Sequence, residues 1–85
     1  MYKTFIKKSV EKQLLQISSV YYKSIREKID ELGENPRPNG FRKLEGTINK
    51  YRVRVGQYRI IYSIDDDILT IEVINIGHRK DVYRI

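Results

Sequence analysis

The sequence predicts an α+β fold with the element order β-α-α-β-β-β, in which an antiparallel sheet carries an N-terminal helical hairpin on one face. Apolar residues recur at helical spacing in two stretches before residue 34, and they alternate with polar residues in three stretches after residue 50. Because amphipathic helices bury their apolar stripes against another layer, we expect the helix pair to lie on the sheet. At 85 residues, the chain is expected to form one domain spanning 1–85.

The first part of the chain is predicted to form a short strand followed by two helices. Residues 2–6 alternate and contain strand formers, and Ser9 is expected to cap the first helix. The apolar stripe of this helix consists of Val10, Leu14 and Ile17. The stripe of the second helix consists of Tyr21, Ile25, Ile29 and Leu32. Gly33 and Pro36 are expected to end the second helix.

The second half of the chain is predicted to form a hairpin and a third strand. Residues 51–55 and 58–64 alternate strictly around Gly56-Gln57, a pair that fits a two-residue type II′ turn. The three consecutive aspartates at 65–67 lack the spaced ligands and the glycine of a calcium loop, so we interpret them as a solvated turn. Residues 68–76 are the third expected strand.

The composition excludes several classes of protein. With 40% hydrophobic and 33% charged residues and no long apolar run, the chain is expected to be a small soluble domain without a membrane span. With no Cys and one His, it is expected to have no disulfide, no thiolate nucleophile, no metal site and no cofactor. No secretory signal follows the N-terminal lysines, so a cytoplasmic location is expected.

The positive charge is concentrated in the middle of the chain. The net charge is +6, and residues 36–64 hold seven basic side chains against Glu45 alone. Part of this block is the segment from residue 34 to about residue 50, which is rich in Asn, Pro and Gly and is predicted to be a long loop. Within it, Lys43 and Lys50 are candidate RNA-binding residues. A concentrated basic patch favours nucleic acid or an acidic protein as the partner, and solubility alone is the simpler alternative.

The hairpin register brings arginine side chains together. With Gly56-Gln57 as the turn, Arg54 pairs with Arg59, so that Arg52, Arg54 and Arg59 share one face of the sheet. Like charges directly opposite each other destabilise a sheet, and a bound anion would explain their presence. Guanidinium groups bind phosphate in a bidentate way, which favours a phosphodiester ligand. An ion pair between Arg52 and Glu72 is the structural alternative.

The C-terminal segment adds chemistry that RNA cleavage requires. Such a reaction needs a base for the 2′-OH, cations for the phosphorus centre and an acid for the leaving 5′-oxygen, and it needs no metal. His78, Arg79 and Tyr83 are candidates for these tasks. Gly77 is expected to let the segment bend back toward the arginine-bearing side of the hairpin.

Three segments of the chain resemble the RelE toxins of the RelE/ParE toxin–antitoxin systems: YRVRVG at 51–56, YRIIY at 58–62 and IGHRKDVY at 76–83. The resemblance covers nearly the whole chain, and it agrees with the expected element order. It implies a metal-independent endoribonuclease that inhibits translation by cutting mRNA in the ribosomal A site through attack of the 2′-OH. It also implies that a RelB-like antitoxin binds and blocks the protein.

The resemblance also implies roles for individual residues. Arg52 and Arg54 occupy positions where lysines often serve as base and charge stabiliser in this family. Arginine stays protonated and is a poor proton acceptor, so the role of base does not transfer to them. Histidine titrates near neutral pH, and His78 is therefore the candidate general base or acid.

Three further residues match positions of the family. Arg59 matches the arginine that clamps phosphate, and Arg79 matches the arginine that protonates the leaving group or stabilises its charge. Tyr83 matches the tyrosine that orients the substrate or stacks on it. We expect the side chains of Arg59 and Arg79 to be exposed.

Two alternatives have different functions. On the ParE side of the same superfamily, the fold inhibits DNA gyrase without nuclease activity. A plain nucleic-acid-binding module would need only the basic face, and it would bind RNA in a salt-dependent way without cleaving it.

Overall fold

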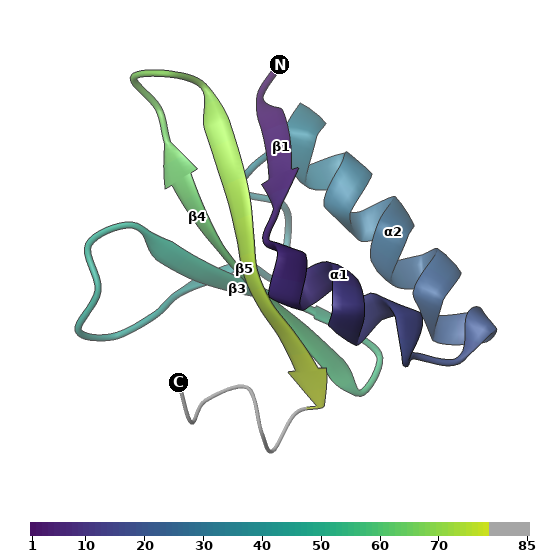
Figure 1. Cartoon of the computed structure of the whole chain (residues 1–85). Coiled ribbons are helices and arrows are strands. Elements are labelled where there is room, and N and C mark those ends of the chain that lie inside the picture. Colours follow the sequence, from purple (N-terminus) through teal and green to yellow (C-terminus); the bar gives the residue numbers. More distant parts are fainter. Residues whose placement is uncertain (79–85) are drawn as a thin grey trace.

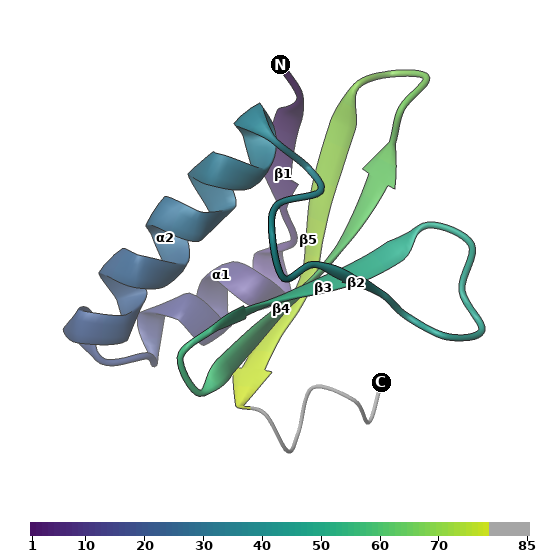
Figure 2. The ribbon, with the colours of Figure 1, turned by 180° about the vertical axis from the view of Figure 1, so that it is seen from behind.

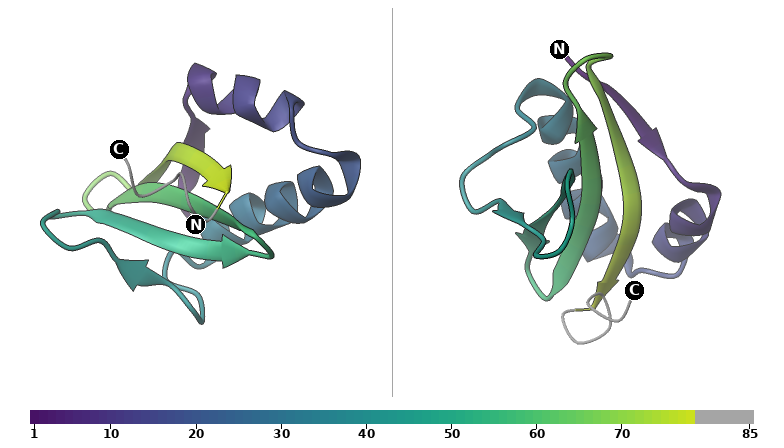
Figure 3. Two further views of the ribbon diagram at one scale, coloured as in Figure 1. Left: turned by 90° about the horizontal axis from the view of Figure 1, so that it is seen from below. Right: turned by 90° about the vertical axis from the view of Figure 1, so that its left-hand side faces the viewer.

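The computed structural model describes residues 1–78, in which two helices and five strands form. The strands are β1 (Lys3–Ile6), β2 (Arg42–Lys43), β3 (Lys50–Val55), β4 (Tyr58–Asp65) and β5 (Thr70–His78), and the helices are α1 (Lys8–Leu15) and α2 (Ser19–Glu34). Both helices lie on the same side of the sheet (Figures 1 and 3). The α+β class and the helix pair on one face are therefore confirmed.

The strand order in the sheet is β1-β5-β4-β3-β2. β2, β3, β4 and β5 pair with their neighbours in antiparallel fashion, as expected, but β1 runs parallel to β5. Parallel neighbours need a long crossover connection, and α1 and α2 supply it. The fold differs from the expected all-antiparallel sheet in this one pairing.

The segment predicted to be a long loop contains the short strand β2. Arg42 pairs with Arg52, and Lys43 pairs with Tyr51. The backbone N–H of Leu44 then donates to the carbonyl of Lys50 at 2.9 Å. The loop between β2 and β3 projects from the sheet (Figure 1). The sheet therefore has five strands, one more than the sequence indicates.

The helix boundaries differ from the expected ones at two residues. α1 begins at Lys8, and the preceding residue makes no side-chain capping bond, so Ser9 is not the cap. Gly33 lies inside α2, which continues to Glu34. The carbonyl of Gly33 accepts a hydrogen bond from the N–H of Tyr2 at 2.9 Å. The glycine therefore allows the chain just before β1 to approach the helix instead of ending it.

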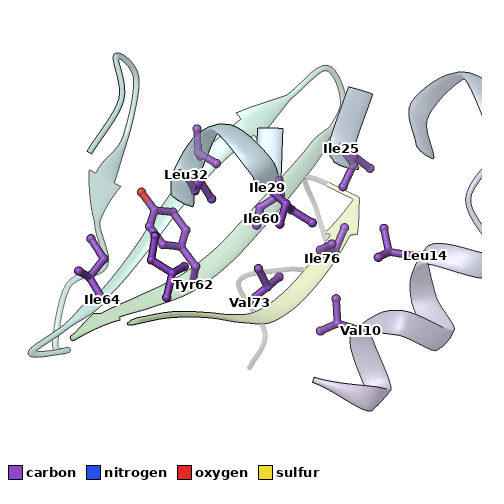
Figure 4. Close-up of a cluster of buried hydrophobic side chains, with 12 residues drawn as sticks. Val10, Leu14, Ile25, Ile29, Leu32, Ile60, Tyr62, Ile64, Val73 and Ile76 are labelled. Carbon is purple, nitrogen blue, oxygen red and sulfur yellow. The ribbon is translucent and has the colours of Figure 1, made fainter. Parts of the chain in front are cut away.

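The hydrophobic core lies between the helix pair and the sheet (Figure 4). Its fully buried members include Ile25, Ile29, Leu32, Ile60, Tyr62, Ile71, Val73 and Ile76. The hydroxyl of Tyr62 donates to the carbonyl of Pro36 at 2.7 Å, which ties the segment after α2 to the sheet. Neither helix within residues 1–78 is long and apolar enough to cross a membrane.

A β-bulge interrupts the pairing of β4 with β5. Ile61 pairs with Asn75 and Tyr62 pairs with Val73, so Ile74 is an extra residue on β5. One extra residue moves every later side chain of the strand to the opposite face. Ile76 therefore returns to the core side, which decides where the end of β5 places its side chains.

Candidate functional site

The predicted hairpin register is confirmed. Gly56 has φ +59°, as a type II′ turn requires at its first central position, and it is followed by Gln57. Arg54 lies opposite Arg59, and Arg52 lies opposite Ile61. Directly opposed residues share a face, so the three arginines lie on the side of the sheet away from the helices.

A fourth arginine joins them from β2. Arg42 lies directly opposite Arg52, which places it on the same face. We call Arg42, Arg52, Arg54 and Arg59 the arginine face. Sequence analysis missed Arg42 as a site residue because a two-residue strand in a segment rich in Pro and Gly gives no periodic signal.

The members of the arginine face differ in exposure. Arg42 and Arg54 are exposed and Arg52 is half-buried. Arg59 is only 6% exposed, so the expectation that its side chain is exposed is wrong. Arg59 is paired on both sides, with Arg54 of β3 and Gly77 of β5, whereas β2 is the edge strand and pairs with β3 only at Tyr51 and Arg52, which leaves Arg54 without a neighbour on its outer side. A ligand that approaches this face therefore meets Arg42 and Arg54 first.

The ion pair between Arg52 and Glu72, which is the structural alternative to an anion site, does not form. Glu72 lies opposite Ser63, not beside Ile61 where it could reach Arg52. Within the described part of the chain, the ion pairs are Lys28 with Glu31 and Arg37 with Asp66, so Glu72 does not neutralise Arg52.

His78 lies on the other side of the sheet from the arginine face. It is the last residue of β5 and pairs with Tyr58, whose neighbours belong to the core side. The rings of His78 and Tyr58 meet edge to face, with centroids 6.1 Å apart. The bulge at Ile74 is the cause, because an unbulged strand would direct His78 toward the arginines. Gly77 lies opposite Arg59 instead.

The other candidate residues have different positions. Lys43 is exposed and lies opposite Tyr51, on the helix side of the sheet edge. Lys50 is exposed and lies opposite Ser63, on the same side as the arginine face and two residues before Arg52. Arg79 and Tyr83 lie outside the described residues.

A hollow of about 230 Å³ opens at the outer edge of β3. We call it the edge pocket, and its lining residues are Lys28, Asn39, Gly40, Arg42, Arg52, Val53 and Arg54. Segment 35–41, which contributes two of these residues, crosses from the end of α2 to β2 (Figure 2). Four of the lining residues are basic, and no acidic residue of the described chain is among them. Within residues 1–78, no cluster of His, Asp or Glu could hold a metal ion.

Arg37, the remaining arginine of residues 36–64, stabilises the fold. Arg37 Nη2 lies 2.9 Å from Asp66 Oδ2, and the hydroxyl of Tyr2 donates to Asp66 Oδ1 at 2.6 Å. The hydrogen bond from Arg37, helped by that from Tyr2, lowers the pKa of the Asp66 carboxyl. The guanidinium also lies over the ring of Tyr51, 5.7 Å from its centroid. Arg37 thus fastens the segment after α2 to the turn between β4 and β5.

Comparisons with known proteins agree with this fold. Residues 5–83 match the family model described as the ParE toxin of the type II toxin–antitoxin system parDE. A protein of Methanocaldococcus jannaschii that bears the toxin name RelE1 is 33% identical over 84 residues, which cover 93% of this chain and 91% of that protein. Toxin RelG of Mycobacterium tuberculosis is 42% identical over 43 residues, which cover 51% of this chain and 46% of RelG.

The fold also matches a solved toxin–antitoxin structure. The archaeal RelE–RelB complex from Pyrococcus horikoshii superimposes with a TM-score of 0.84 at 33% identity, over 94% of this chain and 97% of the matched one. The family model, the relative matched over its length and this structure all belong to one superfamily. The chain therefore belongs to the RelE/ParE superfamily of type II toxin–antitoxin systems, as a toxin of the RelE type.

Proposed function

We propose that this protein is a ribosome-dependent mRNA endoribonuclease that cuts mRNA in the A site and so inhibits translation. The single observation that carries the proposal is the arginine face, where exposed Arg42 and Arg54 flank Arg52. Directly opposed cations cost stability, and a phosphodiester bound between them offsets that cost. The relatives named above bear the names of RelE-type toxins, which supports this reading.

In the proposed reaction, the 2′-oxygen of a nucleotide attacks the adjacent phosphorus and expels the 5′-oxygen of the next nucleotide. The products are a cyclic phosphate and a 5′-hydroxyl. Negative charge grows on the non-bridging oxygens in the transition state, and guanidinium groups already held in place stabilise it. Arg54 is accessible for this task, and Arg52 and Arg59 lie beside it on the same face.

The proton transfers require groups other than these arginines. The arginines stay protonated and do not accept the 2′-OH proton. His78 is our candidate for general base or acid, and Arg79 and Tyr83 are candidates for the leaving group and for substrate orientation by family resemblance. His78 lies at the end of β5 on the core side. It therefore acts on an RNA only if the RNA passes around that end of the sheet.

A RelB-like antitoxin is the proposed protein partner. The RelE-type protein of the Pyrococcus horikoshii structure is bound to RelB, and its fold covers nearly all of this chain. The ribosome A site and mRNA are the other proposed partners. Because translation takes place in the cytoplasm, we propose that the protein acts there.

A second candidate function is inhibition of DNA gyrase without nuclease activity. The observation in its favour is that the matching family model is described as the ParE toxin. A ParE-like inhibitor and a plain basic binding module share one property: neither of them cleaves a message.

The proposal is tested with purified ribosomes that are programmed with a defined message. We expect wild-type protein to cut within the A-site codon only when ribosomes are present, and Arg54→Ala to reduce cutting by at least about 100-fold, the scale on which one stabilising donor acts. Lys23→Ala is the matched control, since it removes an exposed charge from α2. Wild-type protein that cuts no message, or an Arg54→Ala variant that cuts normally, would contradict the proposal.

A further inference from the structure

The edge pocket contains a cation that the arginine face does not. Lys28 comes from α2, in the helix layer, whereas Arg42, Arg52 and Arg54 come from the sheet. It lies three residues after the buried Ile25 and one before the buried Ile29, at the border of the apolar stripe. Its side chain is 25% exposed and lines the pocket together with residues of the sheet edge.

The pocket is built to receive an anion. Arg42 and Arg52 oppose each other on its sheet side, and each guanidinium carries several N–H donors in a planar fork. The ammonium of Lys28 lies 3.2 Å from Glu31 Oε2, and an ammonium has three N–H donors, so that contact leaves it donors for a second acceptor. Glu31 itself does not line the pocket.

The backbone at this edge also offers a hydrogen-bond donor. Val55 pairs with Tyr58 across a two-residue turn, so the N–H of Arg54 points away from β4, toward the outer edge of β3. β2 begins at Arg42, opposite Arg52, and covers only the part of that edge before Arg54. Gly40, which lines the pocket, leaves open space beside it, since an added Cβ would meet no atom within 4 Å.

We propose that the edge pocket is a second phosphate site, which holds a backbone phosphate of the single-stranded RNA whose neighbouring phosphate lies on the arginine face. Arg42, Arg52 and Arg54 belong to both, so an RNA strand that crosses the arginine face continues into the pocket along a continuous row of cations. Lys28 and Arg42 hold the second phosphate and fix the direction of the strand. This inference rests on the proposed function, since it takes RNA as the ligand.

The test is direct binding of a short single-stranded RNA, made uncleavable by 2′-O-methyl groups, to the purified protein at several salt concentrations. We compare wild type with Lys28→Gln, which removes only the pocket's own cation, and with Lys23→Gln, an exposed lysine on the same helix. The logarithm of the binding constant falls linearly with the logarithm of the salt concentration, and losing one phosphate contact makes this slope about 0.7 less steep. We expect this decrease for Lys28→Gln and an unchanged slope for Lys23→Gln.

A scan of the RNA with single neutral methylphosphonate linkages locates the contact. In wild type we expect two neighbouring linkages at which neutralisation weakens binding, and in Lys28→Gln we expect one of them to lose its effect. The Lys28–Glu31 pair is surface-exposed and contributes little to stability, so both variants should melt like wild type.

The outcomes separate this inference from the proposed function. A lowered slope for Lys28→Gln in a protein that does not cleave on ribosomes supports the pocket and contradicts the nuclease. An unchanged slope and an unchanged methylphosphonate pattern contradict the pocket even if cleavage is found. Absence of RNA binding by wild type, or loss of antitoxin affinity in Lys28→Gln with RNA binding intact, would also overturn the inference, and the latter would assign the pocket to a protein carboxylate.

Discussion

Arg42 on β2 lies directly opposite Arg52 on β3, so that two cations share one face at the edge of the sheet. Like charges in this position destabilise a sheet, and neither residue has an ion-pair partner among the described residues. Sequences usually place opposite charges or neutral residues in such pairs. A face that binds an anion explains this pair, because the bound anion offsets the stability that the fold loses through the opposed cations.

Replacing Arg42 should therefore stabilise the protein. We expect Arg42→Thr to raise the free energy of unfolding by a few tenths to about 1 kcal/mol at low salt, since it removes the like-charge pair. The gain should shrink as salt screens the charges. Urea unfolding at low and high NaCl measures it. Lys43→Thr is the control, because Lys43 lies opposite Tyr51 and not opposite a cation. Equal effects of the two substitutions would contradict the charge argument.

Gly33 should be intolerant of alanine despite its place in a helix. Helix propensity alone favours alanine by about 1 kcal/mol. A Cβ at this position would lie 3.1 Å from Thr4 Oγ1 and 3.3 Å from the carbonyl oxygen of Tyr2, both of which lie next to α2. We expect Gly33→Ala to lower the free energy of unfolding by about 1–3 kcal/mol.

The control for this prediction is Ser24→Ala, an exposed position on the same helix. It should be neutral or stabilise by a few tenths of a kcal/mol, following propensity alone. Thermal unfolding followed by circular dichroism compares the two. If Gly33→Ala were as stable as Ser24→Ala, the close approach of the chain before β1 would not explain this glycine.

Asp66 should make stability depend on acidic pH. Because Arg37 and Tyr2 lower its pKa in the folded state, the ionised carboxyl stabilises the fold above the ordinary pKa of about 4. This contribution is lost as pH falls through the lowered value. We expect Asp66→Asn to lower the melting temperature at neutral pH and the difference from wild type to vanish in acid. Asp67→Asn, in the same turn, is the control and should leave the melting temperature at neutral pH close to that of wild type, since the carboxyl of Asp67 forms no ion pair among the described residues.

Tyr62 should contribute through its hydroxyl as well as its ring. Burial raises its pKa to about 12, and its hydroxyl is bonded to the buried carbonyl of Pro36. Tyr62→Phe leaves that carbonyl without its donor, and we expect a loss of about 1–2 kcal/mol in urea unfolding. Tyr22→Phe, on the exposed side of α2, should change nothing. In a spectrophotometric titration, the Phe variant should lack the tyrosine that ionises near pH 12.

The sequence predicts the hairpin correctly because local chemistry decides it. Gly56-Gln57 fixes a two-residue turn, the turn fixes the pairing of Val55 with Tyr58, and alternation then places every arginine of β3 and β4. The contacts that determine this face lie within a dozen residues of one another along the chain.

Features that no local sequence signal marks escape sequence analysis. β2 exists because Arg42 and Lys43 meet β3, not because two residues favour a strand. The bulge at Ile74 places His78 on the opposite side of the sheet, and no residue type in the sequence predicts this bulge. Lys28 reaches the edge pocket only through the packing of α2 on the sheet. These pairing and packing contacts place Arg42 and Lys28 beside the arginines of β3 and separate His78 from them.

The measurement that tests the central claim most directly is mapping of mRNA 5′ ends in cells after induced expression of wild type, Arg54→Ala and Lys23→Ala. We predict new 5′-hydroxyl ends within translated codons for wild type and Lys23→Ala, and their absence for Arg54→Ala, which should fold normally because its side chain is exposed. Growth inhibition without new mRNA ends, accompanied by DNA damage signalling, would contradict the ribonuclease and indicate a gyrase-directed toxin.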